Sequence, residues 1–281
     1  MIPPLPDILV EPIVRAALAE DLGRAGDITS LACIEAGTRL MASFVSRDAG
    51  VIAGIDCARL VISTMDPAAW FEAEVADGDA VHAGAVLARV DADARALLGA
   101  ERVALNLLGR LSGIATLTAA YVAAVQGTRA RIVDTRKTTP GLRALEKYAV
   151  RCGGGANHRF GLDDAVLIKD NHVAACGGIA EALRRARAHA GHLVGVEVEV
   201  DSLGQLAEAL EHRADVILLD NFSLADLKAA VATTAGRAVL EASGGVNLGT
   251  VAGIAATGVN LISVGALTHS APALDVGLDA T

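Results

Sequence analysis

The sequence has few aromatic residues and no excess of basic residues, and both features exclude classes of partner. Only 2% of its 281 residues are aromatic, whereas 53% are hydrophobic, so Ala, Val, Leu and Ile must form the core. The formal net charge of −9 leaves no basic surface for nucleic acid or an anionic membrane. Basic residues do not alternate with aromatic ones either. We therefore expect no nucleic-acid partner and no membrane partner.

Motifs for metal binding, secretion and acyl carriage are also missing. The four cysteines have no CxxC spacing, which favours idle thiols in a reducing cytosol. The N-terminal segment lacks a basic stretch before an apolar one, so we expect no signal peptide and a cytoplasmic location. Val103–Val125 carries Asn106 and Arg110 and is interpreted as a core helix. The turn at Asp77 resembles those of biotinyl carriers, but no lysine precedes Lys137, so it is interpreted as an ordinary turn.

Short apolar runs and helical patterns alternate in the second half of the chain. This alternation predicts βαβ units and a parallel sheet, as in a barrel or a doubly wound fold. Ser202 and Ser223 stand where helix N-caps are expected. The predicted strands are Arg131–Asp134, Ala165–Ile168, Val194–Val200, Val216–Leu219, Ala238–Leu240 and Leu261–Val264, and the helical segments between them are Ile179–Ala190, Leu203–His212, Leu224–Thr233 and Leu248–Ala256.

The first half of the chain lacks this alternation. Pro12–Leu22 has helical periodicity and is followed by Gly23. Residues 40–98 alternate apolar and polar positions between turn signals, which predicts a mixed sheet with hairpins. The long helical region Ala100–Gln126 joins the halves, and we place the domain boundary inside it.

Polar residues or glycines follow the predicted strands of the second half, except that in Val194–Val200 two glutamates lie inside the strand. Because the carboxyl ends of parallel strands meet at one rim, these residues should form one site. The segments are Asp134-Thr135-Arg136-Lys137, Lys169-Asp170-Asn171-His172, Glu197-Val198-Glu199, Asp220-Asn221, Ser243-Gly244-Gly245 and Gly265-Ala266.

The charges at this rim predict an anionic substrate. Two of the four lysines, Lys137 and Lys169, fall at strand ends, where an ammonium group contacts phosphate or carboxylate oxygens. Glu199 and Asp220 could bind sugar hydroxyls or hold a divalent metal through water, and Glu197 shares a strand face with Glu199.

Two loops add further anion-binding chemistry. Ser243-Gly244-Gly245 allows backbone N–H groups to approach a phosphate. The glycine-rich loop ahead of His158 and Arg159 lets both reach inward, and a guanidinium group binds a carboxylate at two points.

Together these motifs resemble the quinolinate phosphoribosyltransferase family. The resemblance covers nearly the whole chain, and its most specific stretches are Asp134–Arg143, Glu146–Leu162, Leu167–His172, Leu219–Phe222 and Leu267–His269. A related branch, associated with molybdate transport operons, shares the fold and some motifs. The full Thr-Arg-Lys-Thr-Thr-Pro-Gly-Leu-Arg and Asn-His-Arg stretches favour the quinolinate enzymes.

The resemblance implies a type II phosphoribosyltransferase fold. A mixed α/β N-terminal domain at residues 1–112 would precede an incomplete α/β barrel of about six parallel strands at residues 113–268. The tail, residues 269–281, would return to the first domain. The implied activity is that of a pentosyltransferase in NAD biosynthesis, which converts quinolinate and phosphoribosyl pyrophosphate to nicotinate mononucleotide, pyrophosphate and CO2.

The resemblance also implies roles for individual residues. Lys137, Lys169, Glu199 and Asp220 would be catalytic, with the two acids on the ribose hydroxyls. Magnesium would arrive with the pyrophosphate, and homodimers, open to further assembly into hexamers, would share Arg102 in trans. The implied quinolinate contacts are Arg136, His158, Arg159 and the partner subunit's Arg102, and Thr135 is a further implied substrate contact. The implied 5′-phosphate contacts are Ser243, Gly244, Gly245, Val264, Gly265 and Ala266.

Two other hypotheses come from the residues alone. Lys169, at its strand end, could form a Schiff base in an aldolase. The rim could instead serve a non-catalytic sensor of a phosphorylated ligand.

Overall fold

Two compact units make up the chain in the computed structural model, which describes residues 2–280. The first unit comprises Met1–Ala119, Thr138–Gly154 and Leu267–Thr281. The second comprises Ala120–Lys137 and Gly155–Ala266.

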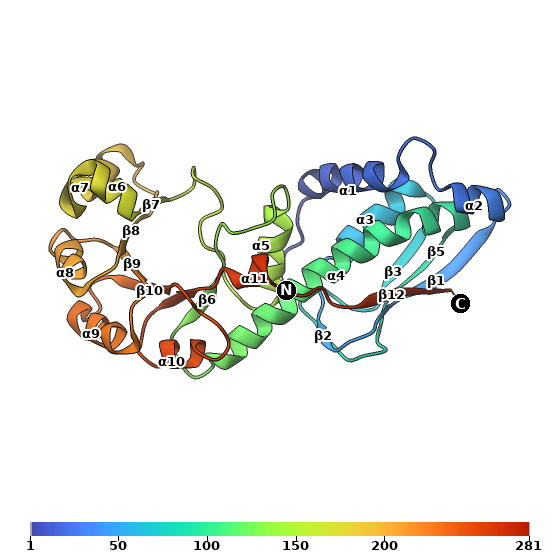
Figure 1. Cartoon of the computed structure of the whole chain (residues 1–281). Coiled ribbons are helices and arrows are strands. Elements are labelled where there is room, and N and C mark those ends of the chain that lie inside the picture. The colour runs from blue at the N-terminus through green and yellow to red at the C-terminus, as the bar shows by residue number, and fades with distance from the viewer. Residues whose placement is uncertain (1, 281) are drawn as a thin grey trace. The chain divides into compact units, whose positions relative to one another are not determined.

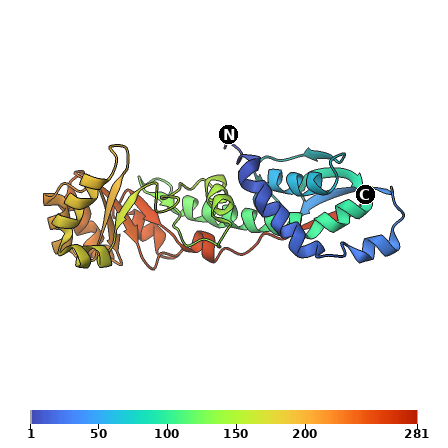
Figure 2. The same cartoon turned by 90° about the horizontal axis from the view of Figure 1, so that it is seen from above.

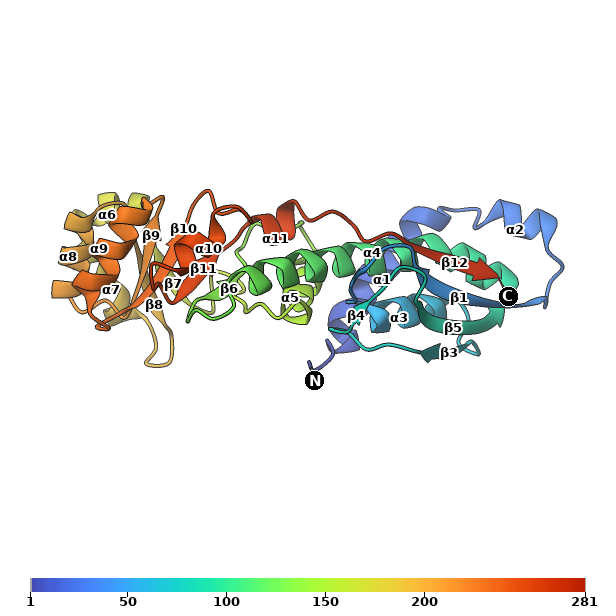
Figure 3. The ribbon, with the colours of Figure 1, turned by 90° about the horizontal axis from the view of Figure 1, so that it is seen from below.

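An antiparallel sheet of four strands forms the centre of the first unit. Its order is β12-β1-β5-β3, so the last strand of the chain pairs with the first. Phe44 lies opposite Leu278 in this pairing, and Figure 3 shows β12 running alongside β1. The strands are β1 (Arg39–Ser46), β3 (Trp70–Ala73), β5 (Val86–Asp93) and β12 (Val276–Ala280); β2 (Gly50–Val51) and β4 (Ala80–Val81) form a separate pair.

The helices of the first unit differ from the sequence prediction, most clearly at residues 7–11 and 55–65. The first helix begins at Asp7, not Pro12, so Pro12 lies inside it. Residues 55–65, predicted as part of a mixed sheet, form a helix whose buried Ile55, Ala58 and Ile62 recur at helical spacing. Figure 2 shows α1 lying across α3. The helices are α1 (Asp7–Leu22), α2 (Ile28–Cys33), α3 (Ile55–Met65), α4 (Ala94–Ala124) and α5 (Arg143–Cys152).

The Asp77 turn has a structural role beyond reversing the chain. Its carboxylate accepts hydrogen bonds from the backbone N–H groups of Gly54 and Ile55, at the start of α3, and from the Tyr148 hydroxyl at 2.7 Å. Burial raises the pKa of Asp77 despite these donors. The side chain therefore fixes both α3 and α5.

Helix α4 is long and apolar enough to cross a membrane by length and composition alone. Its most apolar window is 56% buried within the protein, and Leu108, Leu111 and Ile114 are almost wholly enclosed. A core helix has this pattern, as the sequence predicted.

Six parallel strands form the sheet of the second unit, in the order β6-β11-β10-β9-β8-β7. All six strands predicted from the sequence are present. They are β6 (Arg131–Val133), β7 (Val166–Ile168), β8 (Val196–Val200), β9 (Val216–Asp220), β10 (Val239–Ser243) and β11 (Leu261–Ser263).

Helices cover one face of this sheet. Figure 1 shows α7, α8 and α9 along the outer side of the strands. Val198, Ile217 and Leu240 are buried next to the polar-face positions along their strands, so they face these helices. Ser202 and Ser223 cap α8 and α9 by accepting from backbone N–H groups three residues on, as predicted. The helices are α6 (Asp170–Cys176), α7 (Ile179–His189), α8 (Leu203–Glu211), α9 (Leu224–Thr234), α10 (Val251–Ala255) and α11 (Ala266–His269), of which only Ala266 belongs to the second unit.

The other face of the sheet carries the polar side chains. In the strand register, Leu218 is paired with both Glu199 and Glu241, and Asp220 is paired with Ser243. Because side chains alternate between faces along a strand, these residues share the face opposite the helices.

Candidate active site

A cavity of about 440 Å³ opens over this polar face, and all of its lining residues belong to the second unit. Most residues of the predicted site that lie in this unit meet here. The lining residues are Thr135, Arg136, Lys137, His158, Arg159, Leu167, Lys169, Glu199, Leu218, Asp220, Glu241, Ser243 and Ser263.

One part of the cavity is acidic, with a lysine beside the acids. The Lys169 ammonium lies 3.7 Å from Glu199 Oε2, and the Lys169 side chain is half-exposed. Burial raises the pKa of Glu199, as do the nearby charges of Asp220 and Asp170, whereas Lys169 opposes the shift. The carboxylates and the ammonium group can therefore bind hydroxyl groups and anionic oxygens side by side.

Another part of the cavity holds two guanidinium groups. The Nε atoms of Arg136 and Arg159 are buried and have no hydrogen-bond partner among residues 2–280. Burial lowers the pKa of Arg159, and the neighbouring charge of Arg136 lowers it further. A buried Nε–H group without an acceptor is costly, so these two neighbouring cations favour an anion that accepts from both Nε atoms.

Asp134 anchors the loop that carries His158 and Arg159. Its buried carboxylate accepts from the Asn157 amide at 2.6 Å and from the His158 backbone N–H at 2.9 Å. Ala156 also forms a parallel bridge with Val133 at the end of β6. This anchoring places His158 and Arg159 at the cavity.

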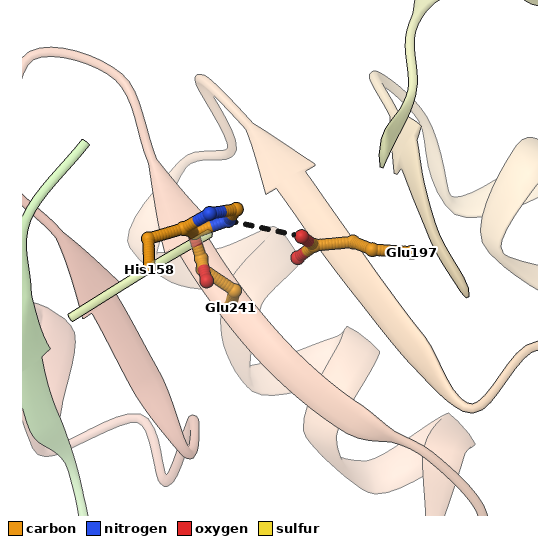
Figure 4. Close-up of side chains that lie close together, drawn as sticks. All are labelled: His158, Glu197 and Glu241. Atoms are coloured by element: carbon orange, nitrogen blue, oxygen red, sulfur yellow. Dashed lines mark hydrogen bonds and ion pairs between the residues drawn. The ribbon is translucent and has the colours of Figure 1, made fainter. Parts of the chain in front are cut away.

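His158 lies between two glutamates of the sheet (Figure 4). Its Nε2 is 3.0 Å from Glu197 Oε2 and 3.7 Å from Glu241 Oε1. Its Nδ1 accepts the Arg159 backbone N–H at 2.7 Å. Both ring nitrogens thus have partners within the chain.

The glycine segments at the last two strands lie around the cavity but do not line it. Gly244 and Gly245 have φ of 94° and 62°, in the left-handed region that favours glycine. Val264 is buried and donates its N–H to Val133, and Gly265 leads to Ala266, the first residue of α11. Their predicted contact with a phosphate stays a prediction.

Arg102 lies in the first unit, on α4, with an exposed side chain. It is not among the residues that line the cavity. Its role in a partner subunit's site is taken up under the proposed function.

Glu241 is one of two polar lining residues that the sequence analysis did not select. The sequence could have indicated Glu241, because it lies two residues before Ser243 and therefore on the same face of the strand. Ser263, on β11, is the second, and it lies level with Val133.

Comparison with known proteins identifies the family. The descriptions "Quinolinate phosphoribosyl transferase, N-terminal domain" and "C-terminal domain" match residues 27–112 and 114–279. The chain belongs to the quinolinate phosphoribosyltransferase family. As a member of this family it is an enzyme, a pentosyltransferase, which favours this activity over the aldolase and the sensor.

Individual relatives resemble the chain along most of its length. The nicotinate-nucleotide pyrophosphorylase [carboxylating] of Mycobacterium leprae is 52% identical over 95% of this chain and 95% of its own. A quinolinate phosphoribosyltransferase [decarboxylating] of Nicotiana tabacum is 42% identical over 95% of this chain and 81% of its own. The structure of the nicotinate-nucleotide pyrophosphorylase from Francisella tularensis matches with a TM-score of 0.95 at 40% identity, covering 100% of this chain and 99% of that one.

Proposed function

We propose that the enzyme joins quinolinate to phosphoribosyl pyrophosphate and releases pyrophosphate and CO2, giving nicotinate mononucleotide for NAD synthesis in the cytoplasm. The observation that carries this proposal is the division of one cavity into two kinds of chemistry. Two arginines whose buried Nε–H groups have no partner among residues 2–280 occupy one part, and paired acids beside a lysine occupy another. A dianionic ring and a sugar phosphate match these two parts.

The guanidinium groups would bind the pyridine dicarboxylate. Arg136 and Arg159 offer planar donors for its two carboxylates, and desolvation by the cavity strengthens such pairs. Thr135 accepts the Lys137 backbone N–H through its hydroxyl at 3.0 Å, which holds Lys137 in the wall of the cavity.

The acidic part would bind the sugar. Glu199 and Asp220 come from adjacent strands and would accept hydrogen bonds from the ribose hydroxyls. Ser243 and the glycines after it would hold the 5′-phosphate through backbone N–H groups. Lys137 and Lys169 would then lie near the pyrophosphate.

The cavity fits a magnesium ion that arrives on the pyrophosphate rather than one held by the chain. Glu199 lies beside the Lys169 ammonium, an arrangement that suits a hydroxyl or phosphate ligand better than a direct divalent ion. Bound in this way, magnesium would neutralise part of the charge of the leaving group.

The residues of the chain account for the chemistry through charge. The pyridine nitrogen attacks the anomeric carbon while the bond from that carbon to the pyrophosphate oxygen breaks. Glu199 and Asp220 hold the ribose as positive charge develops on the sugar ring. Lys137 and Lys169 stabilise the negative charge on the leaving oxygens. The ring, now a pyridinium, accepts the electron pair left at the carbon next to nitrogen when CO2 departs, and a proton then replaces the carboxylate there.

Arg102 would complete the quinolinate site from a second subunit of a homodimer. Arg102→Ala and Lys169→Ala should each be inactive alone. A mixture that exchanges subunits should recover about a quarter of the sites, because half of the dimers are mixed and each mixed dimer has one intact site. No recovery from a mixture with demonstrated exchange would contradict the shared site.

The proposed reaction is tested by incubating the enzyme with quinolinate, phosphoribosyl pyrophosphate and magnesium and following nicotinate mononucleotide by chromatography. Formation of the mononucleotide supports the proposal. If the enzyme instead bound phosphoribosyl pyrophosphate without forming any nucleotide, the proposal would be wrong.

A further inference from the structure

Asn221 lies directly after Asp220 at the end of β9, and it is not among the residues that line the cavity. Its backbone has φ of 55°, in the left-handed region. Asparagine and glycine adopt this conformation at lower cost than most other residues. The chain therefore turns sharply at Asn221, immediately after the acid proposed to bind the ribose.

The side-chain amide of Asn221 holds the Asp220 carboxylate. Its Nδ2 donates a hydrogen bond to Asp220 Oδ2 at 2.8 Å. Among residues 2–280, no other group donates a hydrogen bond to this carboxylate, whereas Glu199 has the Lys169 ammonium beside it. The position of the Asp220 carboxylate is thus set by a single side-chain partner.

The oxygen of the same amide faces Gly244. Because an ionised carboxylate only accepts hydrogen bonds, the amide nitrogen of Asn221 must lie toward Asp220 and its Oδ1 on the other side. A Cβ atom built on Gly244 would lie 2.1 Å from this oxygen and 3.0 Å from the Asn221 backbone nitrogen. The hydrogen that glycine carries in that direction therefore contacts the oxygen, as in weak Cα–H···O bonds.

The backbone of Asn221 makes a third link. Its N–H donates to the Ser243 carbonyl oxygen at 2.9 Å, next to the pair of Asp220 and Ser243 at which β9 and β10 end. Ser243 opens the segment proposed to hold the 5′-phosphate. Asn221 thus contacts both the acid proposed to bind the ribose and the segment proposed to bind the phosphate.

We propose that Asn221 is a positioning residue for the phosphoribosyl group: its amide fixes the Asp220 carboxylate relative to the Ser243-Gly244-Gly245 segment, so that ribose and 5′-phosphate bind together. The proposal rests on the proposed function, because it takes phosphoribosyl pyrophosphate as the ligand of both groups. Asn221 acts through these groups and not through a contact with the substrate. Quinolinate, bound at the two arginines, should not depend on it.

The test is steady-state kinetics of the full-length enzyme with magnesium, in which phosphoribosyl pyrophosphate is varied while quinolinate saturates. Asn221→Gly retains a residue that accepts the positive φ but removes the amide, so Asp220 loses its hydrogen bond. We expect the KM for phosphoribosyl pyrophosphate to rise about tenfold, the effect of losing one hydrogen bond to a charged group. The Kd of quinolinate alone, measured by calorimetry, should not change.

Two other variants separate the amide from the backbone. Ala235→Gly, at another non-glycine position of positive φ (48°) after α9, is the matched control and should leave both constants unchanged. Asn221→Asp keeps the shape of the side chain, but it cannot donate to Asp220 and adds a second negative charge beside it. The KM for phosphoribosyl pyrophosphate should therefore rise at least as far as in Asn221→Gly.

A double-mutant cycle with Gly244→Ala tests the link to the phosphate segment. In the wild type the added methyl group meets the Asn221 amide, whereas in the Asn221→Gly background only the positive φ and the backbone of residue 221 oppose it. Gly244→Ala should therefore raise the KM for phosphoribosyl pyrophosphate by a smaller factor in that background than in the wild type. Equal factors would show that the amide does not act on Gly244 and would refute the proposal.

An unchanged KM for phosphoribosyl pyrophosphate in Asn221→Gly, or an equal loss of quinolinate binding, would overturn the positioning role while leaving the proposed reaction intact. If Asn221→Gly does not fold, Asn221→Asp decides in the same assays. A wild type that forms no nucleotide would instead count against the proposed reaction, and calorimetry with phosphoribosyl pyrophosphate alone then decides. Weaker binding by Asn221→Gly than by the wild type supports the role of Asn221, and equal binding or none by the wild type refutes it.

Discussion

Replacing Lys169 by alanine should separate catalysis from stability. The Lys169 side chain is half-exposed and its ammonium lies 3.7 Å from Glu199, so the ion pair stabilises the fold by at most about 1 kcal/mol. The same ammonium would face pyrophosphate oxygens in the transition state, where one such contact supplies about 3 kcal/mol. Because about 1.4 kcal/mol corresponds to a tenfold change in rate, turnover should fall at least about a hundredfold.

The assay compares steady-state turnover with thermal unfolding of the same preparations. Lys169→Ala should unfold within a few degrees of the wild type, since about 1 kcal/mol shifts Tm by about 2–4 °C in a chain of this size. Lys228→Ala, an exposed lysine of α9, is the matched control and should be normal in both measurements. Near-normal turnover of Lys169→Ala, or a loss of turnover that only follows a loss of folding, would refute this reasoning.

Three further predictions concern stability, phosphate binding and thiol chemistry. The Glu146 carboxylate is fully buried and accepts hydrogen bonds from the Arg110 guanidinium and from Thr139. Glu146→Gln should therefore lower the free energy of unfolding by about 3 kcal/mol in denaturant titrations, whereas Glu20→Gln, at an exposed position, should change it little. A Cβ atom on Gly244 would lie 2.1 Å from Asn221 Oδ1, so Gly244→Ala should raise the KM for phosphoribosyl pyrophosphate about tenfold or more. Gly236 also has a positive φ, 77°, but a Cβ atom there would meet nothing within 4 Å, so Gly236→Ala should leave this KM unchanged. Burial raises the pKa of Cys57 and Cys152 to about 12. Iodoacetamide near pH 8 should therefore label the exposed Cys33 first and the two buried thiols only after unfolding, which peptide mass spectrometry would measure.

The parallel strands of the second unit could be predicted because each is a short, continuous apolar run. A strand buried between helices and a packed inner face has this composition, and the polar residue after it marks its end. The same rule placed Lys137, Lys169, Glu199 and Asp220 at one rim, and the structure brings all four to one cavity.

Parts of the fold and of the site depended on contacts that a sequence pattern does not contain. The sequence predicts helix α3 as part of a sheet because residues 40–98 alternate apolar and polar positions between turn signals. Its start is fixed by Asp77, more than ten residues beyond its end. Glu241 directly follows the predicted strand Ala238–Leu240, and its proximity to Glu197 arises only from the order of β8, β9 and β10 in the sheet. Such pairings are tertiary, so local spacing could not reveal them.

The stoichiometry of CO2 release tests the central claim most directly. The enzyme is incubated with magnesium, phosphoribosyl pyrophosphate and quinolinate labelled in the carboxylate next to the ring nitrogen, and labelled CO2, pyrophosphate and nicotinate mononucleotide are counted. The account predicts equal amounts of the three products, and no CO2 when nicotinate replaces quinolinate. Pyrophosphate release without CO2, or CO2 formed in the absence of phosphoribosyl pyrophosphate, would contradict it.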